Sequence, residues 1–235
     1  MRRLHVVLFL SLGLLTLRAT AAEPDDASSQ VDATAVTAAE TVEQANPALL
    51  DPTLATEQAP DRFRVRFETT EGPFVVEVHR SWAPLGADRF YNLVRIGFYD
   101  GAAFFRNIEG FMIQFGIHGD PPVDAAWESS RMTDDPVRKS NRRAFVSFAM
   151  SGPHSRTTQV FINYSNGNSR LDAMGFSPFG KVVEGMDVVE SLYSGYGEGA
   201  PRGKGPDQGR MRSKGNAYLQ ARFPDLDYVK SAVVE

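Results

Sequence analysis

One arginine within an aromatic segment is the residue of this sequence whose chemistry most needs explaining. Residues 104–115 read FFRNIEGFMIQF, with Arg106 and Gln114 set among aromatic and aliphatic side chains. A buried strand pair could use those apolar residues as core, but an arginine is rarely placed among them unless it is paired or directed at a ligand. Arg106 is therefore either a donor to a ligand or a structural cation paired with Glu109 or another carboxylate.

Other residue types narrow the chemistry that Arg106 could serve. The chain has no cysteine, which excludes disulfides, thiolate catalysis and cysteine-type zinc sites. Its four histidines are scattered without helical metal-binding spacing, and the sequence contains no nucleophile elbow and no phosphate-binding loop motif. We interpret the glycine-rich residues 195–209 as an extended surface loop. A site without metal, cofactor, nucleophile or acid–base pair suits a reaction in which no covalent bond is made or broken.

Composition divides the sequence into three parts. Residues 1–22 carry two arginines near the start, then an apolar stretch and small residues, which is the order of a secretory signal peptide. Residues 23–61 hold nine acidic residues, no Lys or Arg and no aromatic residue, so we predict a disordered acidic tether. Residues 62–235 are long enough to form one folded domain with its own core.

The signal-like segment predicts export, to the periplasm or to the medium. An uncleaved membrane anchor is the alternative, but about a dozen apolar residues are too few to span a bilayer comfortably. We therefore expect cleavage and no stable membrane insertion afterwards. The domain itself has 22 Lys and Arg against 20 Asp and Glu. This near-neutral balance gives no support for a nucleic-acid partner, which requires a basic surface.

Apolar spacing in the domain predicts many short strands and two helices. Residues 62–67 and 74–78 alternate between polar and apolar side chains around a Gly-Pro turn, which indicates a hairpin. Further strand-like runs lie at 104–106, 112–115, 145–150, 160–163, 179–183 and 228–234. Helical spacing marks residues 84–96 and 186–192. We expect a closed or nearly closed β-barrel with helices at its ends.

Three ordered blocks of the domain resemble the cyclophilins, a family of peptidyl-prolyl isomerases. Residues 105–114, FRNIEGFMIQ, resemble the family's arginine-containing signature, with Phe105 where a histidine usually stands. FAMSGP at 148–153, followed by SRTTQVFI at 155–162, resembles the second block. FGKVVEGMDVV at 179–189 resembles the third. The resemblance covers about residues 63–193.

The resemblance implies a mainly β fold: a closed eight-stranded antiparallel β-barrel capped by two α-helices, preceded here by a disordered N-terminal segment. It also implies a pocket for a proline ring. The implied catalytic residues are Arg106, Gln114 and Phe111. The implied substrate-binding residues are Met112, Ala149, Met150, Ser151, Gln159, Phe161, Leu171 and Phe176.

By resemblance, the chain is expected to be a monomer that accelerates X-Pro bond rotation in exported proline-containing polypeptides. In the twisted transition state the amide nitrogen regains its lone pair, so a hydrogen-bond donor aimed there stabilises the transition state more than either ground state. The alternative is a non-catalytic proline-peptide binding or chaperone module on the same fold.

Three pocket positions depart from the family pattern. Met150, Arg170 and Phe176 stand where other members often have asparagine, tryptophan and histidine. Because these positions surround the pocket, we expect weak cyclosporin binding. The tail at residues 194–221 is longer than a minimal cyclophilin needs, and it contains two turn-like segments with no assignable function.

Overall fold

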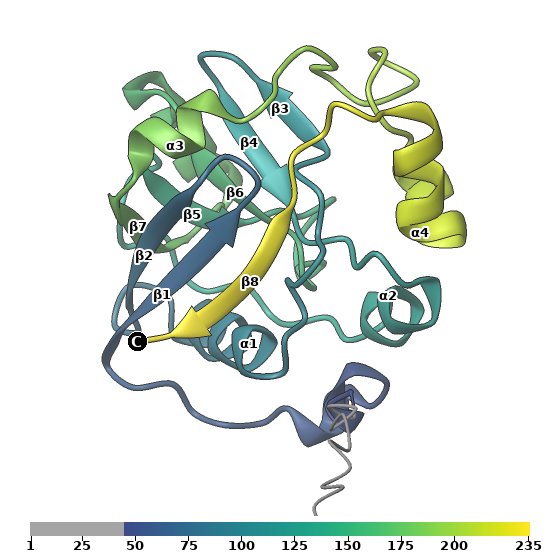
Figure 1. Ribbon diagram of the computed structural model, residues 1–235. Coiled ribbons are helices and arrows are strands. Elements are labelled where there is room, and N and C mark those ends of the chain that lie inside the picture. The colour runs from purple at the N-terminus through teal and green to yellow at the C-terminus, as the bar shows by residue number, and fades with distance from the viewer. Residues whose placement is uncertain (1–44) are drawn as a thin grey trace, which may run out of the picture. The chain divides into compact units, whose positions relative to one another are not determined.

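An eight-stranded antiparallel sheet forms the centre of the structure, a computed structural model that describes residues 45–235 (Figure 1). The strand order across the sheet is β3-β4-β6-β5-β7-β2-β1-β8. The strands are β1 (Arg62–Thr69), β2 (Pro73–His79), β3 (Arg106–Ile108), β4 (Met112–Phe115), β5 (Phe145–Phe148), β6 (Val160–Asn163), β7 (Pro178–Glu184) and β8 (Val229–Val234). The predicted signal peptide and residues 23–44 of the predicted tether lie outside the described residues.

The sheet is strongly curled but open, so the prediction of a closed barrel is wrong. β3 and β8 form its two edges and are not paired with each other. The segments that precede them do meet: Ala103 forms an isolated bridge with Tyr228, and the Phe104 amide donates to the Asp227 carbonyl at 2.9 Å. The two edges therefore meet only in the residues that precede β3 and β8, not along the strands themselves. The eight strands thus form an open half-barrel.

The predicted opening hairpin is confirmed by the pairing of β1 with β2. In β1 the side chains of Phe63, Val65 and Phe67 are buried while their neighbours are more exposed, as the alternation of the sequence predicts. In β2 the residues from Phe74 to Val78 are all buried. The hairpin thus supplies one wall of the main core.

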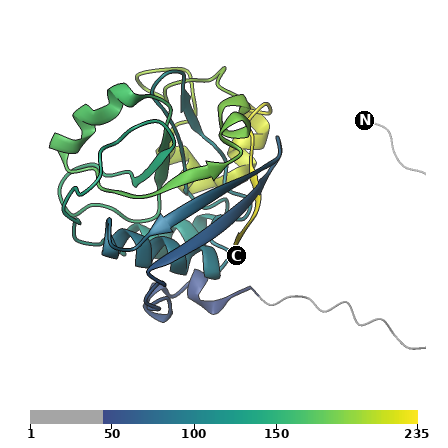
Figure 2. The ribbon, with the colours of Figure 1, turned by 90° about the vertical axis from the view of Figure 1, so that its left-hand side faces the viewer.

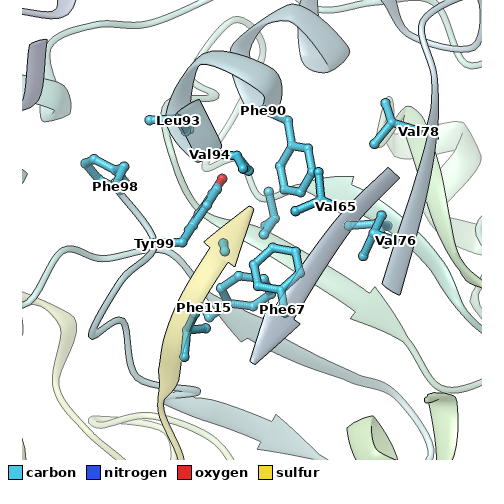
Figure 3. Packing of buried hydrophobic residues seen from close by; sticks show 14 of the residues in the cluster. Val65, Phe67, Val76, Val78, Phe90, Leu93, Val94, Phe98, Tyr99 and Phe115 are labelled. Carbon is cyan, nitrogen blue, oxygen red and sulfur yellow. The ribbon is translucent and has the colours of Figure 1, made fainter. Parts of the chain in front are cut away.

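The main core fills the concave side of the sheet beneath α1 (Figure 3). Phe67 stacks on Phe74 with ring centroids 4.8 Å apart and meets Phe115 edge-on at 5.7 Å. Phe90 of α1 packs against Phe179 at 4.8 Å. Burial of this many aromatic rings is a large apolar contribution, which a folded domain without disulfides requires.

Two helices were predicted, whereas two further α-helices and three 3-10 helices were not. The α1 helix (Pro84–Arg95) and the α3 helix (Met186–Ser191) agree with the predicted pair. The additional helices are α2 (Pro121–Glu128), α4 (Gln208–Arg222) and the 3-10 helices η1 (Pro47–Leu49), η2 (Pro52–Leu54) and η3 (Asn166–Met174). Within residues 45–235 no helix is both long enough and apolar enough to cross a bilayer.

The α4 helix occupies the part of the tail where the sequence suggested only turns. It lies beside α2 (Figure 1), and the backbone amide of Asn216 donates to the Gly119 carbonyl at 2.9 Å. At Gly215 the backbone has φ 58° and ψ −152°, so α4 consists of two helical pieces joined at a kink. Its apolar spacing is interrupted at that point, which explains why helical periodicity was not recognised.

Residues 45–61 are packed on the domain, although the sequence assigned them to the tether. The Trp127 indole donates to the Leu49 carbonyl at 3.1 Å. The Asn92 side chain accepts from the Glu57 amide at 3.0 Å and donates to its carbonyl at 2.7 Å. Figure 2 shows this segment lying below α1. The folded unit therefore includes residues that precede the predicted domain start at residue 62.

Candidate active site

The β3–β4 hairpin places Arg106 directly opposite Gln114. These two residues are register partners, so their side chains lie on the same face of the sheet. Arg106 Nη1 donates to Gln114 Oε1 at 3.0 Å. On the next strand, β6, Phe161 is the partner of Gln114, and Gln114 Nε2 donates to Gln159 Oε1 at 2.7 Å. Arg106, Gln114 and Gln159 therefore form a continuous hydrogen-bonded chain.

An apolar pocket lies beside this polar chain, separate from the main core. Met112, Phe161 and Leu171 are buried together, with Phe111 and Phe176 packed against them. The rings of Phe161 and Phe176 meet edge-on, with centroids 5.6 Å apart. Such a set of side chains can receive a small aliphatic ring.

Asparagine side chains behind the pocket hold Phe111 in place. Asn168 Nδ2 donates to the Phe111 carbonyl at 2.7 Å and to Asn163 Oδ1 at 2.8 Å. The Tyr164 amide also donates to the Phe111 carbonyl, at 2.9 Å. Because Asn163 and Asn168 are almost fully buried, these bonds satisfy polar groups that would otherwise cost stability. The pocket wall is therefore rigid at Phe111.

A cavity of about 390 Å³ connects the apolar pocket with Arg106. All eleven residues that the sequence placed in the site line it. They are Arg106, Phe111, Met112, Gln114, Ala149, Met150, Ser151, Gln159, Phe161, Leu171 and Phe176. The structure thus brings together residues from the first two blocks with Leu171 and Phe176, which lie between the second block and the third. The individual roles assigned to these residues stay predictions.

Part of the cavity wall was missed by the sequence analysis. It comes from the segment after α3 and from α4, and it consists of Glu198, Arg202, Gln208 and Arg212. The sequence analysis interpreted the glycine-rich residues 195–209 as an extended surface loop and assigned no site residue to them. The one available signal was Glu198, a carboxylate in a segment rich in glycine.

Glu198 forms a two-point ion pair with Arg106. Arg106 Nε donates to Glu198 Oε1 and Arg106 Nη2 donates to Glu198 Oε2, both at 2.7 Å. The two side chains are 23% and 32% exposed. The hydrogen bond from Arg106 is the main reason that the pKa of Glu198 lies below its usual value, so Glu198 is ionised at neutral pH.

The alternative prediction for Arg106, a cation paired with Glu109 or another carboxylate, agrees with the pair that Arg106 forms with Glu198. Glu109 instead accepts a hydrogen bond from Ser194 Oγ at 2.8 Å. Pairing does not remove Arg106 from the cavity, since it still lines the wall and still contacts Gln114.

Two of the departures from the family pattern are visible at the pocket rim. The Arg170 guanidinium lies over the Phe111 ring, 5.0 Å from its centroid, which is a cation–π geometry. Met150 reaches the far side of the cavity near Gly175. A cation and a thioether therefore stand where other family members often have tryptophan and asparagine.

The arrangement offers hydrogen-bond donors beside an apolar cavity. In residues 45–235 no group of three or more His, Cys, Asp or Glu side chains has the placement to hold a metal ion. A guanidinium beside an apolar pocket can bind a substrate amide and stabilise charge that develops on it.

Comparison with known proteins gives one consistent family. Residues 64–208 match the family model described as cyclophilin type peptidyl-prolyl cis-trans isomerase. A peptidyl-prolyl cis-trans isomerase of Acinetobacter baylyi is 35% identical over 133 residues, covering 54% of this chain and 70% of the relative. The Arabidopsis thaliana isomerase CYP18-1 is 34% identical over 143 residues, covering 57% and 86%.

Solved structures give the same fold. A cyclophilin-type isomerase of Cryptosporidium parvum superimposes with a TM-score of 0.53 at 22% identity, covering 74% of this chain and 98% of that one. The same protein solved in the presence of the dipeptide Ala-Pro gives a TM-score of 0.53 at 23% identity.

Proposed function

This chain belongs to the cyclophilin-type peptidyl-prolyl cis-trans isomerases, and from that premise we propose that it accelerates X-Pro bond rotation in exported polypeptides by transition-state stabilisation alone. Arg106 is the donor to the twisting amide, Gln114 and Phe111 complete the catalytic group, and the apolar pocket holds the proline ring. The observation that carries this proposal is the guanidinium of Arg106 at the wall of a cavity that also contains Met112 and Phe161.

The energetics of the reaction fit these residue types. Rotation about a peptide bond has a barrier of about 18–20 kcal/mol because the nitrogen lone pair is delocalised into the carbonyl. When the bond twists, the lone pair returns to the nitrogen and can accept a hydrogen bond from a guanidinium that cannot lose its charge. Holding the ring in the pocket while Arg106 donates to the nitrogen lets binding energy favour the twisted form.

Replacing Arg106 tests the proposal. Arg106→Ala should lower kcat/KM for a proline tetrapeptide by about 100-fold or more, because it removes a donor directed at the transition state. Arg143→Ala is the matched control: Arg143 also forms a two-point ion pair, with Glu190, but outside the cavity. An NMR exchange assay at equilibrium measures both variants, and circular dichroism checks their folding.

The assay also separates the enzyme from the alternative module. A folded wild-type domain that binds proline peptides without accelerating their exchange would establish a binding or chaperone role. Near-wild-type exchange catalysed by Arg106→Ala would instead show that rotation is accelerated without this donor.

Export is part of the proposal, and it rests on the pattern of residues 1–22. Expression of the full chain in a bacterial host should yield a protein that starts near Glu23, found outside the cytoplasm. Intact-mass measurement of the purified protein checks this. A full-length species retained in the membrane fraction would favour the uncleaved anchor.

Weak cyclosporin binding and a monomeric state are proposed as well. Support for the first comes from Met150, Arg170 and Phe176, which line or cover the rim of the pocket. Calorimetry with cyclosporin should show a dissociation constant well above the nanomolar range, and light scattering should give the mass of one chain.

A further inference from the structure

The carboxylate of Glu198 contacts the donor of the proposed reaction, and it comes from a segment outside the three family-like blocks. A guanidinium has five N–H donors in a fixed planar fork. Glu198 accepts two of them, one from Nε and one from Nη2, each at 2.7 Å. Both bonds lie along one edge of the fork, which is the two-point geometry that fixes a guanidinium most strongly.

The opposite corner of the guanidinium faces the pocket. Arg106 Nη1 lies 3.0 Å from Gln114 Oε1 and 4.0 Å from Met112 Sδ. Met112 belongs to the apolar cluster of the pocket and Gln114 to its polar chain. Glu198 therefore holds the edge that points away from Met112 and leaves Nη1 beside the place where a proline ring would lie.

We propose that Glu198 is a positioning residue for the isomerase reaction, fixing the Arg106 guanidinium so that its Nη1 corner is presented to the substrate amide. The proposal rests on the function proposed above. It assigns to the segment between α3 and α4 a contribution to catalysis.

The loop that carries Glu198 is itself fixed. The Gly205 amide donates to the Glu198 carbonyl at 2.9 Å, and the Gly199 amide donates to Glu198 Oε1 at 2.9 Å. Tyr196, two residues earlier, donates from its hydroxyl to Asp225 at 2.9 Å and packs edge-on against Phe223 at 5.0 Å. Glu198 is thus presented from a loop that is tied to the end of α4 and to the residues beyond it.

The residue before Arg106 is part of the same support. Phe105 is buried in a second hydrophobic cluster with Met211, Leu219 and Leu226, all from the C-terminal segment. Consecutive strand residues point to opposite faces of a sheet. The C-terminal segment therefore contacts both sides of this strand end. Its apolar side chains pack against Phe105 on one face, and Glu198 pairs with Arg106 on the other.

A rival account is that Glu198 competes with the substrate for Arg106. The geometry opposes it, because the cavity of about 390 Å³ is open with Glu198 in place and is still lined by Phe111, Phe161 and Leu171. A competitor would be expected to fill the ring pocket or to occupy the Nη1 corner. The two accounts predict changes of opposite sign when Glu198 is replaced.

Replacement of the carboxylate by its amide isostere is the decisive experiment. In Glu198→Gln the charge and one strong acceptor are lost while the shape is kept, so Arg106 can turn away from the pocket. We expect kcat to fall about tenfold with KM changed by less than about twofold, because misplacement of a catalytic group acts on the transition state. The melting temperature should stay close to that of the wild type, since the pair is partly exposed.

Glu190→Gln is the matched control, because Glu190 forms the same kind of two-point pair with Arg143 outside the cavity. Direct evidence for positioning comes from the Nε–H proton of Arg106 in NMR spectra. This proton should exchange slowly with water in the wild type and in Glu190→Gln, and rapidly in Glu198→Gln. Glu198→Ala in an Arg106→Ala background should have no further effect on the rate.

Each result decides between the accounts. A rise in kcat/KM for Glu198→Gln would establish that Glu198 competes with the substrate. An unchanged kcat would show that Glu198 has no role in the reaction. A lower rate accompanied by a lower melting temperature would show that Glu198 only supports the fold. All three overturn the positioning role while leaving the function of Arg106 intact. Retained activity in Arg106→Ala alone would instead contradict the proposed function.

Discussion

The regions around Arg106 and Arg156 each contain an ion pair between an arginine and a carboxylate, but in different surroundings. Arg106 is 23% exposed at the cavity wall, whereas the Arg156 side chain is 2% exposed. Arg156 Nη1 donates to Asp135 Oδ2 at 3.1 Å, and Nη2 donates to the Thr133 carbonyl. Both arginines precede a short run of pocket residues in the sequence, so neither residue type nor position distinguishes them.

The carboxylate partners explain the difference. Asp135 also accepts hydrogen bonds from the backbone amides of Leu85 and Gly86, at 3.0 and 2.9 Å. These amides lie in the first turn of α1, where backbone N–H groups have no acceptor within the helix. The Glu198 carboxylate accepts only one further bond, from the backbone amide of its neighbour Gly199. The Arg156 pair thus joins the start of α1 to the segment between β5 and β6, while the Arg106 pair leaves donors directed at a cavity. Arg156 bonds only groups that hold the fold together, so it stabilises the protein. Arg106 keeps N–H donors that face a cavity, so it can act on a ligand.

Removing the cation from the buried pair should have the largest effect on stability. Arg156→Met leaves Asp135 buried without a counter-charge, which we expect to lower the free energy of unfolding by about 3–5 kcal/mol. Arg106→Met should lower it by less than about 1 kcal/mol, because Glu198 stays partly in water. Urea denaturation followed by fluorescence measures both values. Equal destabilisation by the two substitutions would contradict the comparison.

A backbone substitution in α4 tests whether the C-terminal segment supports the Arg106 region. Gly215 has φ 58° and ψ −152°, a conformation nearly restricted to glycine, and a side chain there would collide with the Gly119 carbonyl. Gly215→Ala should cost about 1–3 kcal/mol of stability. Because α4 and the Glu198 loop share a hydrophobic cluster, kcat should fall as well, by up to a few fold.

Gly209→Ala serves as the control for that substitution. Gly209 lies in the first turn of α4 and has no positive φ. A Cβ at Gly209 would have only the end of the Asp207 side chain as a close neighbour, at 3.3 Å. Stability and kcat should both stay near wild type in this variant. A loss of stability in Gly215→Ala without any change in kcat would show that α4 does not influence Arg106.

The part of the site on β3, β4 and β6 could be predicted because residues close together in the sequence determine it. Arg106 and Gln114 lie on one hairpin, and the alternation that forms a hairpin also sets which residues face each other. The ring pocket followed from resemblance to family blocks. Closure of the barrel was predicted wrongly, because nothing in the local pattern of β3 or β8 states whether two edge strands meet.

The C-terminal wall could not be predicted because it depends on contacts between distant segments. Glu198 reaches Arg106 across 92 positions of the chain, and Asn216 reaches Gly101 across 115. Glycines and prolines in residues 195–209 reduce the periodicity from which an element is recognised. Likewise, residues 45–61 bind to Asn92 and Trp127 through backbone groups, which any composition can supply.

The smallest expected effect is a pH dependence confined to the Arg106 region. Hydrogen bonding by Arg106 holds the pKa of Glu198 below its ordinary value of 4.5. A carboxylate with a lowered pKa keeps its ion pair above the ordinary value and loses it as the pH falls through the lowered one. The other charged groups that line this part of the cavity are Arg202 and Arg212. At pH 4.5 less than half of Glu198 is therefore protonated.

It follows that kcat/KM of the wild type should be constant from pH 8 to about pH 5 and should keep more than about half of its value at pH 4.5. Glu198→Gln has no group to titrate at this position, so its lower rate should not change over the same range. The NMR exchange assay gives both profiles, with circular dichroism recorded at each pH to confirm that the domain is folded. A wild-type rate already halved at pH 5.5 would mean that a group other than Glu198 controls Arg106.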